Sequence, residues 1–262
     1  MNVKILVATH KKYNIPNNDI YMPLHVGKEG KEDLGYVGDN TGDNISDKNP
    51  YFCELTGLYW AWKNLKCNYI GLVHYRRHFS NSNYFTIYFS KNKYNLFLKS
   101  NDIYNILKSY DIILPKKRNY CIETVYDHYK HSHFEKDMLE VKNIINEKYP
   151  QYIDNFNKVM NGKNLHLFNM FICKKEYFDE YCSWIFGILF EVEKRIDISQ
   201  YDVYQSRIYG FLGERLFNVW INNKKLKIYE CNIINIEKIN WIKKIVKFLK
   251  NKIEMKLWGK KF

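Results

Sequence analysis

The alternation of strand-like and helix-like segments in the first half of the chain constrains the fold most. Residues 3–9 (VKILVAT) and 69–74 (YIGLVH) are short and apolar, as expected of strands buried on both faces of a sheet. Between them, residues 50–65 carry apolar side chains at helical spacing, with Asn49 suited to the N-cap and Pro50 to the first helical position. This order predicts parallel pairing and an α/β fold with a mainly parallel central sheet flanked by helices.

The rest of the chain extends this pattern. Regular elements are predicted at four more places: strands over 111–114 and 165–173, the second interrupted by Asn169, and helices over 177–195 and about 203–221. Residues 10–49 hold five glycines and two prolines, which predicts a long functional loop region. The stretch between residues 116 and 149, rich in His and Tyr, is predicted to be helix or loop on the surface.

The charge distribution divides the chain into a body and a tail. At 262 residues, one domain is expected over 1–222, followed by a tail over 223–262. Residues 238–262 hold nine lysines and one glutamate, with apolar side chains at helical spacing. Such a basic amphipathic helix suits the surface of an anionic cytoplasmic leaflet. The alternative is a helix packed on the domain with its lysines in solvent.

Cysteine usage and apolar runs bear on the compartment. The six cysteines form no CxxC pair, which indicates buried thiols in a reducing environment. The longest uncharged apolar run, Trp184–Phe190, is far too short to cross a bilayer, and the first ten residues contain no signal-peptide pattern. We expect a cytoplasmic protein that is peripheral on the inner face of the cytoplasmic membrane.

Two predicted strands run out into polar and basic residues. The first ends in Thr9, His10 and Lys11, and the second runs into His74, Tyr75 and a pair of arginines. Ligands of open α/β sheets gather beyond the carboxyl ends of strands. Because the guanidinium group presents a rigid fork of donors, the arginine pair at residues 76–77 predicts a diphosphate site, and the first strand end is either part of it or an ordinary polar turn.

Six sequence blocks resemble, in order, bacterial capsular and exopolysaccharide glycosyltransferases long catalogued as a domain of unknown function. The resemblance covers about residues 3–222, and the blocks are VATHKKY, GDNTGDNISDKNPYFCELTGLYWAWKN, YIGLVHYRRHF, DIILP, LFNMFICKKEYFDEYCSWIF and GFLGERLFNVW. The resemblance implies a single GT-A-like domain that transfers a hexose, with galactose in pyranose or furanose form plausible, from a UDP-linked or similar nucleotide donor. The acceptor would be a lipid-linked saccharide in capsule, exopolysaccharide or O-antigen synthesis.

The resemblance also implies a departure from the usual metal chemistry. Most enzymes of the GT-A fold carry Asp-x-Asp after the strand that corresponds to YIGLVH, and it holds Mn²⁺ or Mg²⁺ on the donor diphosphate. Here His74-Tyr75-Arg76 stands in that place. Hard cations prefer oxygen ligands, so we expect Arg76 and Arg77 to neutralise the diphosphate directly, without a protein-bound metal. The alternative is a divalent cation, Mn²⁺ or Mg²⁺, as cofactor.

The candidate residues fall into three groups. The catalytic candidates are Glu214 as general base, since it matches the GFLGERL block, with His74 and Asp202. The donor-binding candidates are Thr9, His10, Lys11, Lys48, Asn49, Arg76, Arg77 and Asn169. The histidine spacing of residues 128–133 matches no common zinc site, so an acceptor-binding surface is predicted from Tyr126, His128, His131, His133 and Asp137.

Two other classes of function compete with transfer. A sequence pI near 9.2 and a net charge of +13 favour nucleic acid, but residues 238–262 hold +8 of this charge and no nucleic-acid-binding motif is present. We therefore expect no nucleic-acid partner. The other alternative is a nucleotide-sugar-binding protein or inactive transferase, which the missing Asp-x-Asp would allow. P-loop, GxGxxG, serine-elbow and HExxH motifs are also missing.

Overall fold

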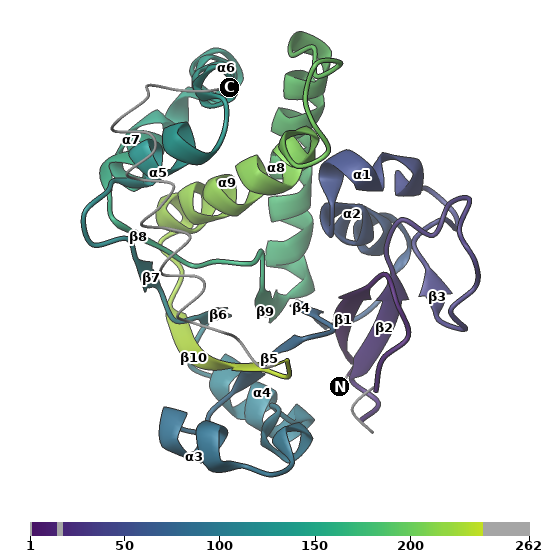
Figure 1. Ribbon diagram of the computed structural model, residues 1–262. Helices are drawn as coiled ribbons and strands as arrows, with labels where there is room; N and C mark the ends of the chain where they lie inside the picture. The colour runs from purple at the N-terminus through teal and green to yellow at the C-terminus, as the bar shows by residue number, and fades with distance from the viewer. Residues whose placement is uncertain (1, 15–17, 238–262) are drawn as a thin grey trace.

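The computed structural model describes residues 2–14 and 18–237. These residues form one mixed α/β domain around an eight-stranded sheet of order β3-β2-β1-β4-β5-β10-β6-β9, in which β9 also pairs with β4 (Figure 1). A two-stranded ribbon, β7 (Arg118–Asn119) with β8 (Asn164–Leu165), lies beside it. Within the described residues, no helix is long and apolar enough to cross a membrane.

The N-terminal half of the sheet is parallel, as the sequence predicts. β1 (Val3–Thr9) lies between β2 (Tyr21–His25) and β4 (Tyr69–His74), and β2 pairs with β3 (Val37–Gly38). The bounds of β1 and β4 are those predicted. The predicted loop over 10–49 is partly wrong, because β2 and β3 lie within it.

The other half of the sheet is mixed, which corrects the prediction of a mainly parallel sheet. β9 (Phe171–Lys174) runs antiparallel to both β4 and β6 (Ile112–Pro115), and β10 (Ile228–Asn235) is parallel to β6 but antiparallel to β5 (Arg77–Ser80). A Cβ on Gly71 of β4 would lie 2.8 Å from the Phe171 carbonyl oxygen, so glycine allows β9 this close approach. Apolar periodicity carries no information on strand direction.

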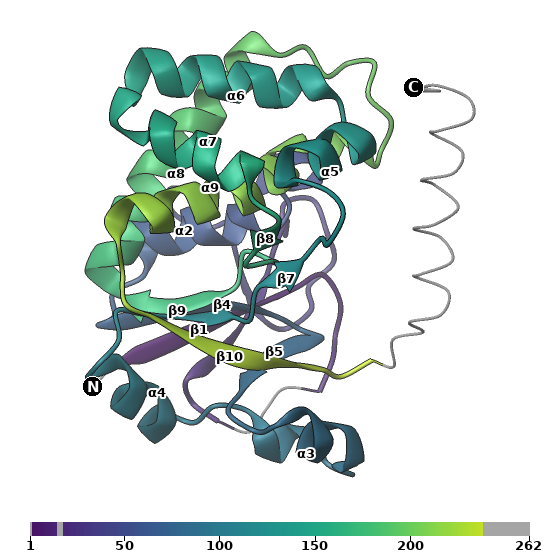
Figure 2. The same cartoon turned by 90° about the vertical axis from the view of Figure 1, so that its left-hand side faces the viewer.

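Helices cover both faces of the sheet. One face carries α2 (Leu55–Asn64), α8 (Lys175–Arg195) and α9 (Ile208–Lys224), with an outer group of α5 (Val125–Ser132), α6 (Glu135–Lys148) and α7 (Ile153–Asn161) (Figure 2). The other face carries α3 (Tyr84–Phe89) and α4 (Ser100–Leu107). Each face has its own core: Leu6 and Ala8 of β1 belong to one, and Ile5 and Val7 to the other.

The predicted helix over 50–65 is two helices. α1 (Asn49–Phe52) ends at Cys53, whose φ of 52° and ψ of −133° turn the chain before α2 begins. Glycine is the residue that adopts such angles without strain, so a cysteine here gives no sequence sign of the break. The predicted helix over about 203–221 likewise begins later, since a 3₁₀ turn, Gln205–Arg207, precedes α9.

A buried aspartate fixes the loop that leads to α1. Asp39 is fully buried and accepts hydrogen bonds from the backbone nitrogens of Gly27 (2.8 Å) and Lys28 (3.1 Å) and from the Thr56 hydroxyl (2.6 Å). The Ser46 hydroxyl donates a fourth bond. A buried carboxylate is tolerated when donors surround it in this way, so Asp39 ties the turn after β2 to α2.

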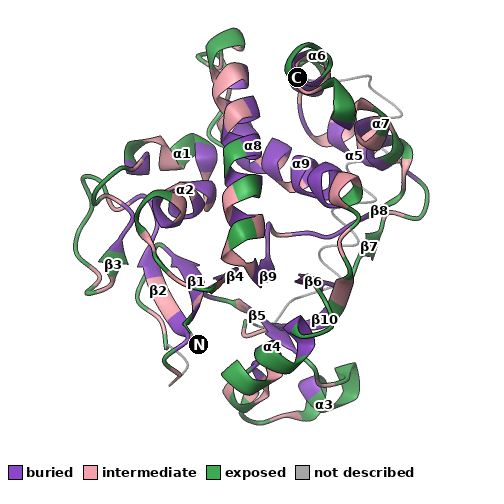
Figure 3. Cartoon of the chain, turned by 180° about the vertical axis from the view of Figure 1, so that it is seen from behind, coloured by how far each residue is buried: buried purple, intermediate pink, exposed green. Residues whose placement is uncertain are grey.

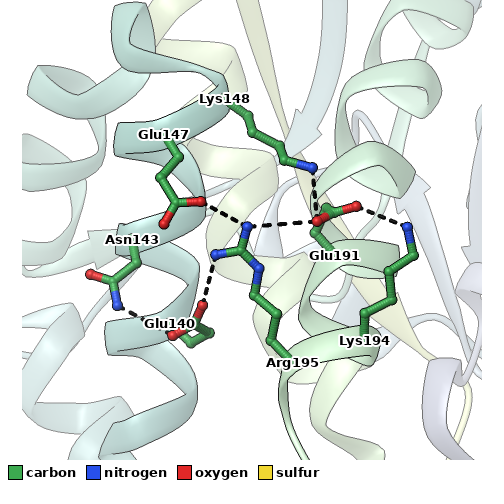
Figure 4. A network of polar contacts seen from close by, with 7 residues as sticks. All are labelled: Glu140, Asn143, Glu147, Lys148, Glu191, Lys194 and Arg195. Carbon is green, nitrogen blue, oxygen red and sulfur yellow. Dashed lines mark hydrogen bonds and ion pairs between the residues drawn. The ribbon is translucent and has the colours of Figure 1, made fainter.

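Ion pairs join α6 to the end of α8 (Figure 4). The Arg195 guanidinium lies 3.1 Å from Glu140 and 2.7 Å from Glu147. Glu191 pairs with Lys148 at 2.8 Å and with Lys194 at 2.9 Å, and these bonds lower the pKa of its carboxyl to about 2. The network holds the outer helices against the long helix that packs on β9.

The predicted tail boundary at residue 222 lies too early. β10 lies within the range predicted to be the tail, yet it pairs with β5 and β6 inside the sheet. Residues 223–237 are therefore part of the domain. The predicted basic amphipathic helix, residues 238–262, lies outside the described residues.

Candidate active site at the ends of β1 and β4

The loop between β8 and β9, residues 166–170, is the centre of the candidate site. The sequence predicts one strand through this region, but two consecutive residues, Phe168 (φ 75°) and Asn169 (φ 52°), adopt the left-handed conformation and break it. Non-glycine residues rarely adopt this conformation, and strained backbone costs about 1–3 kcal/mol for each residue. Such a loop persists only where its surroundings hold it.

Side chains from three other segments hold this loop. His74, at the end of β4, lies with Nε2 2.7 Å from the Phe168 carbonyl oxygen, so this nitrogen donates the bond. On α9, the Glu214 carboxylate accepts a bond of 2.6 Å from the Phe168 backbone nitrogen. Glu54, at the N-cap of α2, accepts one of 2.8 Å from the Asn169 side-chain amide. The loop thus brings two carboxylates together at the end of β4.

Asn169 has one buried polar atom that lacks a hydrogen-bond partner in the described structure. Its side chain is 2% exposed, and its Oδ1 has no hydrogen-bond partner among the described residues. An unsatisfied buried oxygen costs about 1–3 kcal/mol, which a donor from a bound molecule would offset. That Asn169 faces the donor sugar stays a prediction, and Oδ1 is the atom that would accept the bond.

The two arginines after β4 differ in their surroundings. The Arg77 guanidinium lies 4.3 Å from the centre of the Phe168 ring, and in the described part of the chain it forms no ion pair. Burial and the charge of Arg76 lower its pKa, while Glu54 and Glu214 raise it. Arg76 is exposed and lies 3.5 Å from the Glu237 carboxylate. Arg77 is thus a partly desolvated cation without a fixed counter-ion.

Positive charges from separate segments act on His10 at the end of β1. Burial lowers the pKa of His10, and Lys11, Arg76, Lys31 and Arg207 lower it further. These residues come from the end of β1, the β2–β3 connection, the end of β4 and the turn before α9. Their combined field at His10 suits a polyanionic ligand.

The chain bends directly after β1, and a local hydrogen bond stabilises this bend. The Thr9 hydroxyl is buried and donates to the Lys11 carbonyl oxygen at 2.6 Å. The Lys11 ammonium lies 4.9 Å from the centre of the Tyr75 ring and 3.5 Å from Glu237. Lys11 and Arg76 therefore share Glu237, which places them together.

Lys48 and Asn49 have partners elsewhere. The Lys48 ammonium pairs with Glu193 of α8 at 2.7 Å. The Asn49 side chain donates to the carbonyl oxygen of Cys53 (2.8 Å) and to the Thr56 hydroxyl (3.2 Å). Lys48 thus ties the segment before α1 to α8, and Asn49 ties α1 to the start of α2.

His128 is the acceptor candidate that is linked by contacts to the strained loop at residues 166–170. Its ring packs 4.2 Å from the ring of Tyr120, and Nδ1 lies 3.5 Å from the Arg215 guanidinium. Burial first, and then the charge of Arg215, lowers the pKa of His128 to about 3. Arg215 also pairs with Glu214 at 3.2 Å, so a continuous chain of contacts links α5 to the strained loop.

The remaining acceptor candidates spread over α5 and its neighbours. His133 is buried, lies 4.0 Å from the Phe211 ring and bonds Gln205 at 3.0 Å; burial lowers its pKa to about 4. Two others lie beside carboxylates: Tyr126 donates to Glu135 at 2.9 Å, and the Nδ1 of His131 lies 3.4 Å from the Glu123 carboxylate.

The two aspartate candidates serve the local structure. Asp137 is buried and accepts from the Tyr201 hydroxyl at 2.6 Å, and burial raises its pKa to about 6. Asp202 is exposed and accepts from the backbone nitrogens of Tyr204 (2.8 Å) and Gln205 (2.7 Å), which caps the turn before α9.

Sequence reasoning missed Glu54 and Arg207. Glu54 lies in the ELTGLYWAWKN block, so the block itself was the available signal, but no spacing rule separates it from an ordinary helix-start carboxylate. The Arg207 Nε donates to the Cys53 sulfur at 3.2 Å, which ties the turn before α9 to the break between α1 and α2. No local pattern pairs residues so far apart in sequence.

The residues at the end of β4 do not fit a divalent cation of the GT-A type. Such an ion prefers carboxylate and carbonyl oxygens, whereas two arginines and an imidazole that already donates to a carbonyl follow this strand. The carboxylates of Glu54 and Glu214 already accept hydrogen bonds from the strained loop. Across residues 2–14 and 18–237, no group of three or more His, Cys, Asp or Glu side chains is placed to hold a metal ion.

Comparison with known proteins identifies the family. The family model described as "Domain of unknown function (DUF4422)" matches residues 4–225. The chain belongs to this family. The match confirms the resemblance found in the sequence blocks, and it includes β1, β4, the strained loop and α9. A comparison with curated proteins gave no match.

One solved structure shares this DUF4422 chain's fold. It is the apo structure of WbbM, described as a bifunctional glycosyltransferase, with 32% sequence identity and a TM-score of 0.83. The alignment covers 91% of this chain and 46% of that one, so this chain spans about half the length of WbbM. The fold is thus similar to that of a glycosyltransferase, which agrees with the predicted α/β class, although the sheet is mixed and not mainly parallel.

Proposed function

We propose that this chain is a glycosyltransferase that binds a nucleotide-diphosphate sugar at the ends of β1 and β4. The observation that carries the proposal is the group of basic side chains at these two strand ends. Lys11, Arg76 and His10 all lie against the Tyr75 ring, and Arg77, the next residue along from Arg76, has no ion-pair partner in the described structure. The likeness to WbbM, which is described as a glycosyltransferase, supports it. A diphosphate would supply the missing counter-charge.

The chemistry of transfer suits this arrangement. The acceptor hydroxyl attacks the anomeric carbon, the bond between this carbon and the diphosphate oxygen breaks, and its electron pair passes to the leaving diphosphate. Fixed cations aimed at the oxygen that gains charge stabilise the transition state without reorganising solvent. Arg77, partly desolvated against Phe168, and Arg76 are the groups that we assign to this task.

A carboxylate must accept the proton of the acceptor hydroxyl, and two are available. Both oxygens of Glu214, the expected base, already accept bonds, one from the Phe168 backbone and one from Arg215. Glu54 bonds Asn169 through Oε1, and its Oε2 has no hydrogen bond within the described residues. We therefore assign the proton-accepting role to Glu54 and a positioning role to Glu214.

The finer features of the function remain those that the sequence predicts. We propose a UDP-linked hexose, such as galactose, as the donor and a lipid-linked saccharide of capsule, exopolysaccharide or O-antigen synthesis as the acceptor. His128 and its neighbours on α5 are proposed to contact the acceptor. The protein would work on the inner face of the cytoplasmic membrane, with residues 238–262 contributing to attachment.

Donor binding tests the proposal directly. A panel of nucleotide sugars and free nucleotide diphosphates is screened by thermal shift, since a ligand stabilises the fold with the logarithm of its concentration. Arg77→Met should weaken binding of the best ligand by about 10- to 100-fold, because charge-assisted bonds are worth about 1.5–3 kcal/mol. Lys108→Met, which removes an exposed cation beyond α4, is the control.

The outcomes separate this function from its alternatives. Binding that Arg77→Met leaves unchanged would show that the diphosphate lies elsewhere. Binding without transfer or hydrolysis of a labelled donor would favour a nucleotide-sugar-binding protein. Binding of nucleic acid with a strong salt dependence, measured by a filter-binding assay, would favour a nucleic-acid-binding protein instead.

A further inference from the structure

α3 exposes an aromatic surface to solvent. Tyr84 is 63% exposed, Phe85 73%, Tyr88 80% and Phe89 64%, while Ile87 is buried and holds the helix on the domain. Figure 3 shows α3 mostly exposed, next to α4 and on the face of the sheet opposite α8 and α9. In soluble proteins, exposed apolar residues are usually scattered singly, so this clustering indicates an interaction surface.

The aromatic rings form one patch. The ring of Phe89 lies 4.5 Å from that of Phe85 and 5.0 Å from that of Tyr88. The rings therefore pack mainly on one another, with their outer faces in water. Burying a phenylalanine side chain is worth about 1.5–3 kcal/mol, so a partner that covers two of them gains a large free energy.

The segment that contains α3 carries lysines and no acidic residue. Residues 81–101 include no acidic residue and three lysines, Lys91, Lys93 and Lys99. From the end of β6, Lys116 adds a fourth, with its ammonium 5.4 Å from the centre of the Tyr84 ring. Aromatic side chains flanked by lysines are typical of surfaces that lie in the interface of anionic bilayers.

The chain reaches its basic C-terminal sequence beside this patch. The Lys93 ammonium donates to the Asn235 carbonyl oxygen at 2.8 Å, and Asn232 donates to the Ser82 carbonyl oxygen at 2.8 Å. Both ends of the α3 segment are thus tied to β10. The sequence after residue 237 carries a net charge of +8, so it shares the sign of the patch. Like charge disfavours this sequence as the cover of α3 and favours an anionic surface for both.

We infer that α3 inserts Phe85 and Phe89 into the interface of an anionic lipid bilayer, with the neighbouring lysines on the headgroups. The inference goes beyond the proposed function because it assigns a second contact, inside the folded domain, that requires neither donor binding nor catalysis. It also orients the molecule, since the sheet face that bears α3 and α4 would be turned toward the membrane.

Vesicle flotation with the full-length chain tests this inference. The vesicles contain phosphatidylcholine alone or phosphatidylcholine with phosphatidylglycerol. Wild type should float with the anionic vesicles, and the double variant Phe85→Ser/Phe89→Ser should bind them at least about tenfold more weakly. Phe85→Trp/Phe89→Trp should bind as tightly as wild type or more tightly. The control Leu139→Ser/Val203→Ser, which removes two exposed apolar side chains elsewhere, should match wild type.

Three results would overturn the inference. The first is equal binding of wild type and the serine variant to anionic vesicles. The second is a concentration-dependent dimer of wild type, seen by sedimentation velocity, that the serine variant abolishes, because a second copy would then cover α3. The third is a lower melting temperature of the serine variant without vesicles together with unchanged vesicle binding, because residues 238–262 would then be the cover. The donor nucleotide should raise the melting temperature of the serine variant as much as that of wild type. This measurement separates a failure of the membrane inference from a failure of the proposed function.

Discussion

Asp137 makes the stability of the domain depend on pH in a direction opposite to that of most carboxylates. The side chain is 1% exposed and bonds the hydroxyls of Tyr201 (2.6 Å) and Tyr129 (3.5 Å). Burial raises its pKa from 3.8 to about 6, against the lowering effects of these bonds and of Lys136. Between these pH values the unfolded chain releases the proton while the folded protein retains it. Folding stability contributed by this group is therefore full below about pH 4 and falls as pH rises toward 6.

The size of this effect follows from the two pKa values. Each tenfold change in proton affinity is worth about 1.4 kcal/mol, so the group contributes about 3 kcal/mol at low pH that is lost by about pH 7. Asp137→Asn keeps an oxygen for Tyr201 and offers an amide to the Tyr129 hydroxyl, but it cannot ionise. Its unfolding free energy relative to wild type should therefore increase by up to about 3 kcal/mol as pH rises.

Urea denaturation at a series of pH values measures this difference. Subtracting the wild-type curve from the Asp137→Asn curve removes the contributions of all other titrating groups. Asp47→Asn, which removes an exposed carboxylate, is the control for loss of one negative charge. A constant difference between Asp137→Asn and wild type from pH 4 to pH 7 would refute the assignment of a buried carboxyl with a raised pKa.

Three other predictions concern the site and the fold. Glu54→Gln keeps an oxygen for Asn169 and should lower kcat for donor transfer by about 100- to 10,000-fold with little loss of stability. Glu214→Gln should lower the melting temperature, because it removes the negative charge that pairs with the buried Arg215 guanidinium. The reverse pattern in paired kinetics and melting curves would exchange the two roles. Transfer should continue in EDTA, and a complete loss that Mg²⁺ or Mn²⁺ restores would contradict direct neutralisation by arginine. Lys225, at the end of α9, has φ 53° and ψ 37°, so Lys225→Gly should stabilise the fold by about 0.5–1 kcal/mol in chemical denaturation, and the helical control Lys224→Gly should destabilise it by about 1 kcal/mol.

The buried parallel strands are what the sequence reveals best. β1 and β4 have the predicted bounds, and α8 begins two residues before the predicted 177 and ends at Arg195. Continuous apolar runs and helical spacing record burial directly, which explains this agreement. Strand direction leaves no such record, so β9, which runs antiparallel between β4 and β6, could not be predicted.

The sequence was enough to locate the basic residues of the candidate site, but not the strained loop beside them. Arg76 and Arg77 stand next to a recognisable strand, so local sequence was enough to locate them. The left-handed pair Phe168 and Asn169 contains no glycine, and its supports come from residues about 50 to 115 positions away, as the Glu54–Asn169 bond shows. Only tertiary structure makes such a loop stable, and a pattern of side-chain polarity does not record it.

The position of β10 also bears on how the protein is made. This strand is the last element before residue 237, yet it lies between β5 and β6, and Glu237 just beyond it contacts Lys11 and Arg76. During translation, the ribosome must release residues 228–237 before the sheet can close and this carboxylate can reach the two cations. A nascent chain that lacks them would leave β6 with an unpaired edge, so we expect the domain to fold late in synthesis and in one cooperative step.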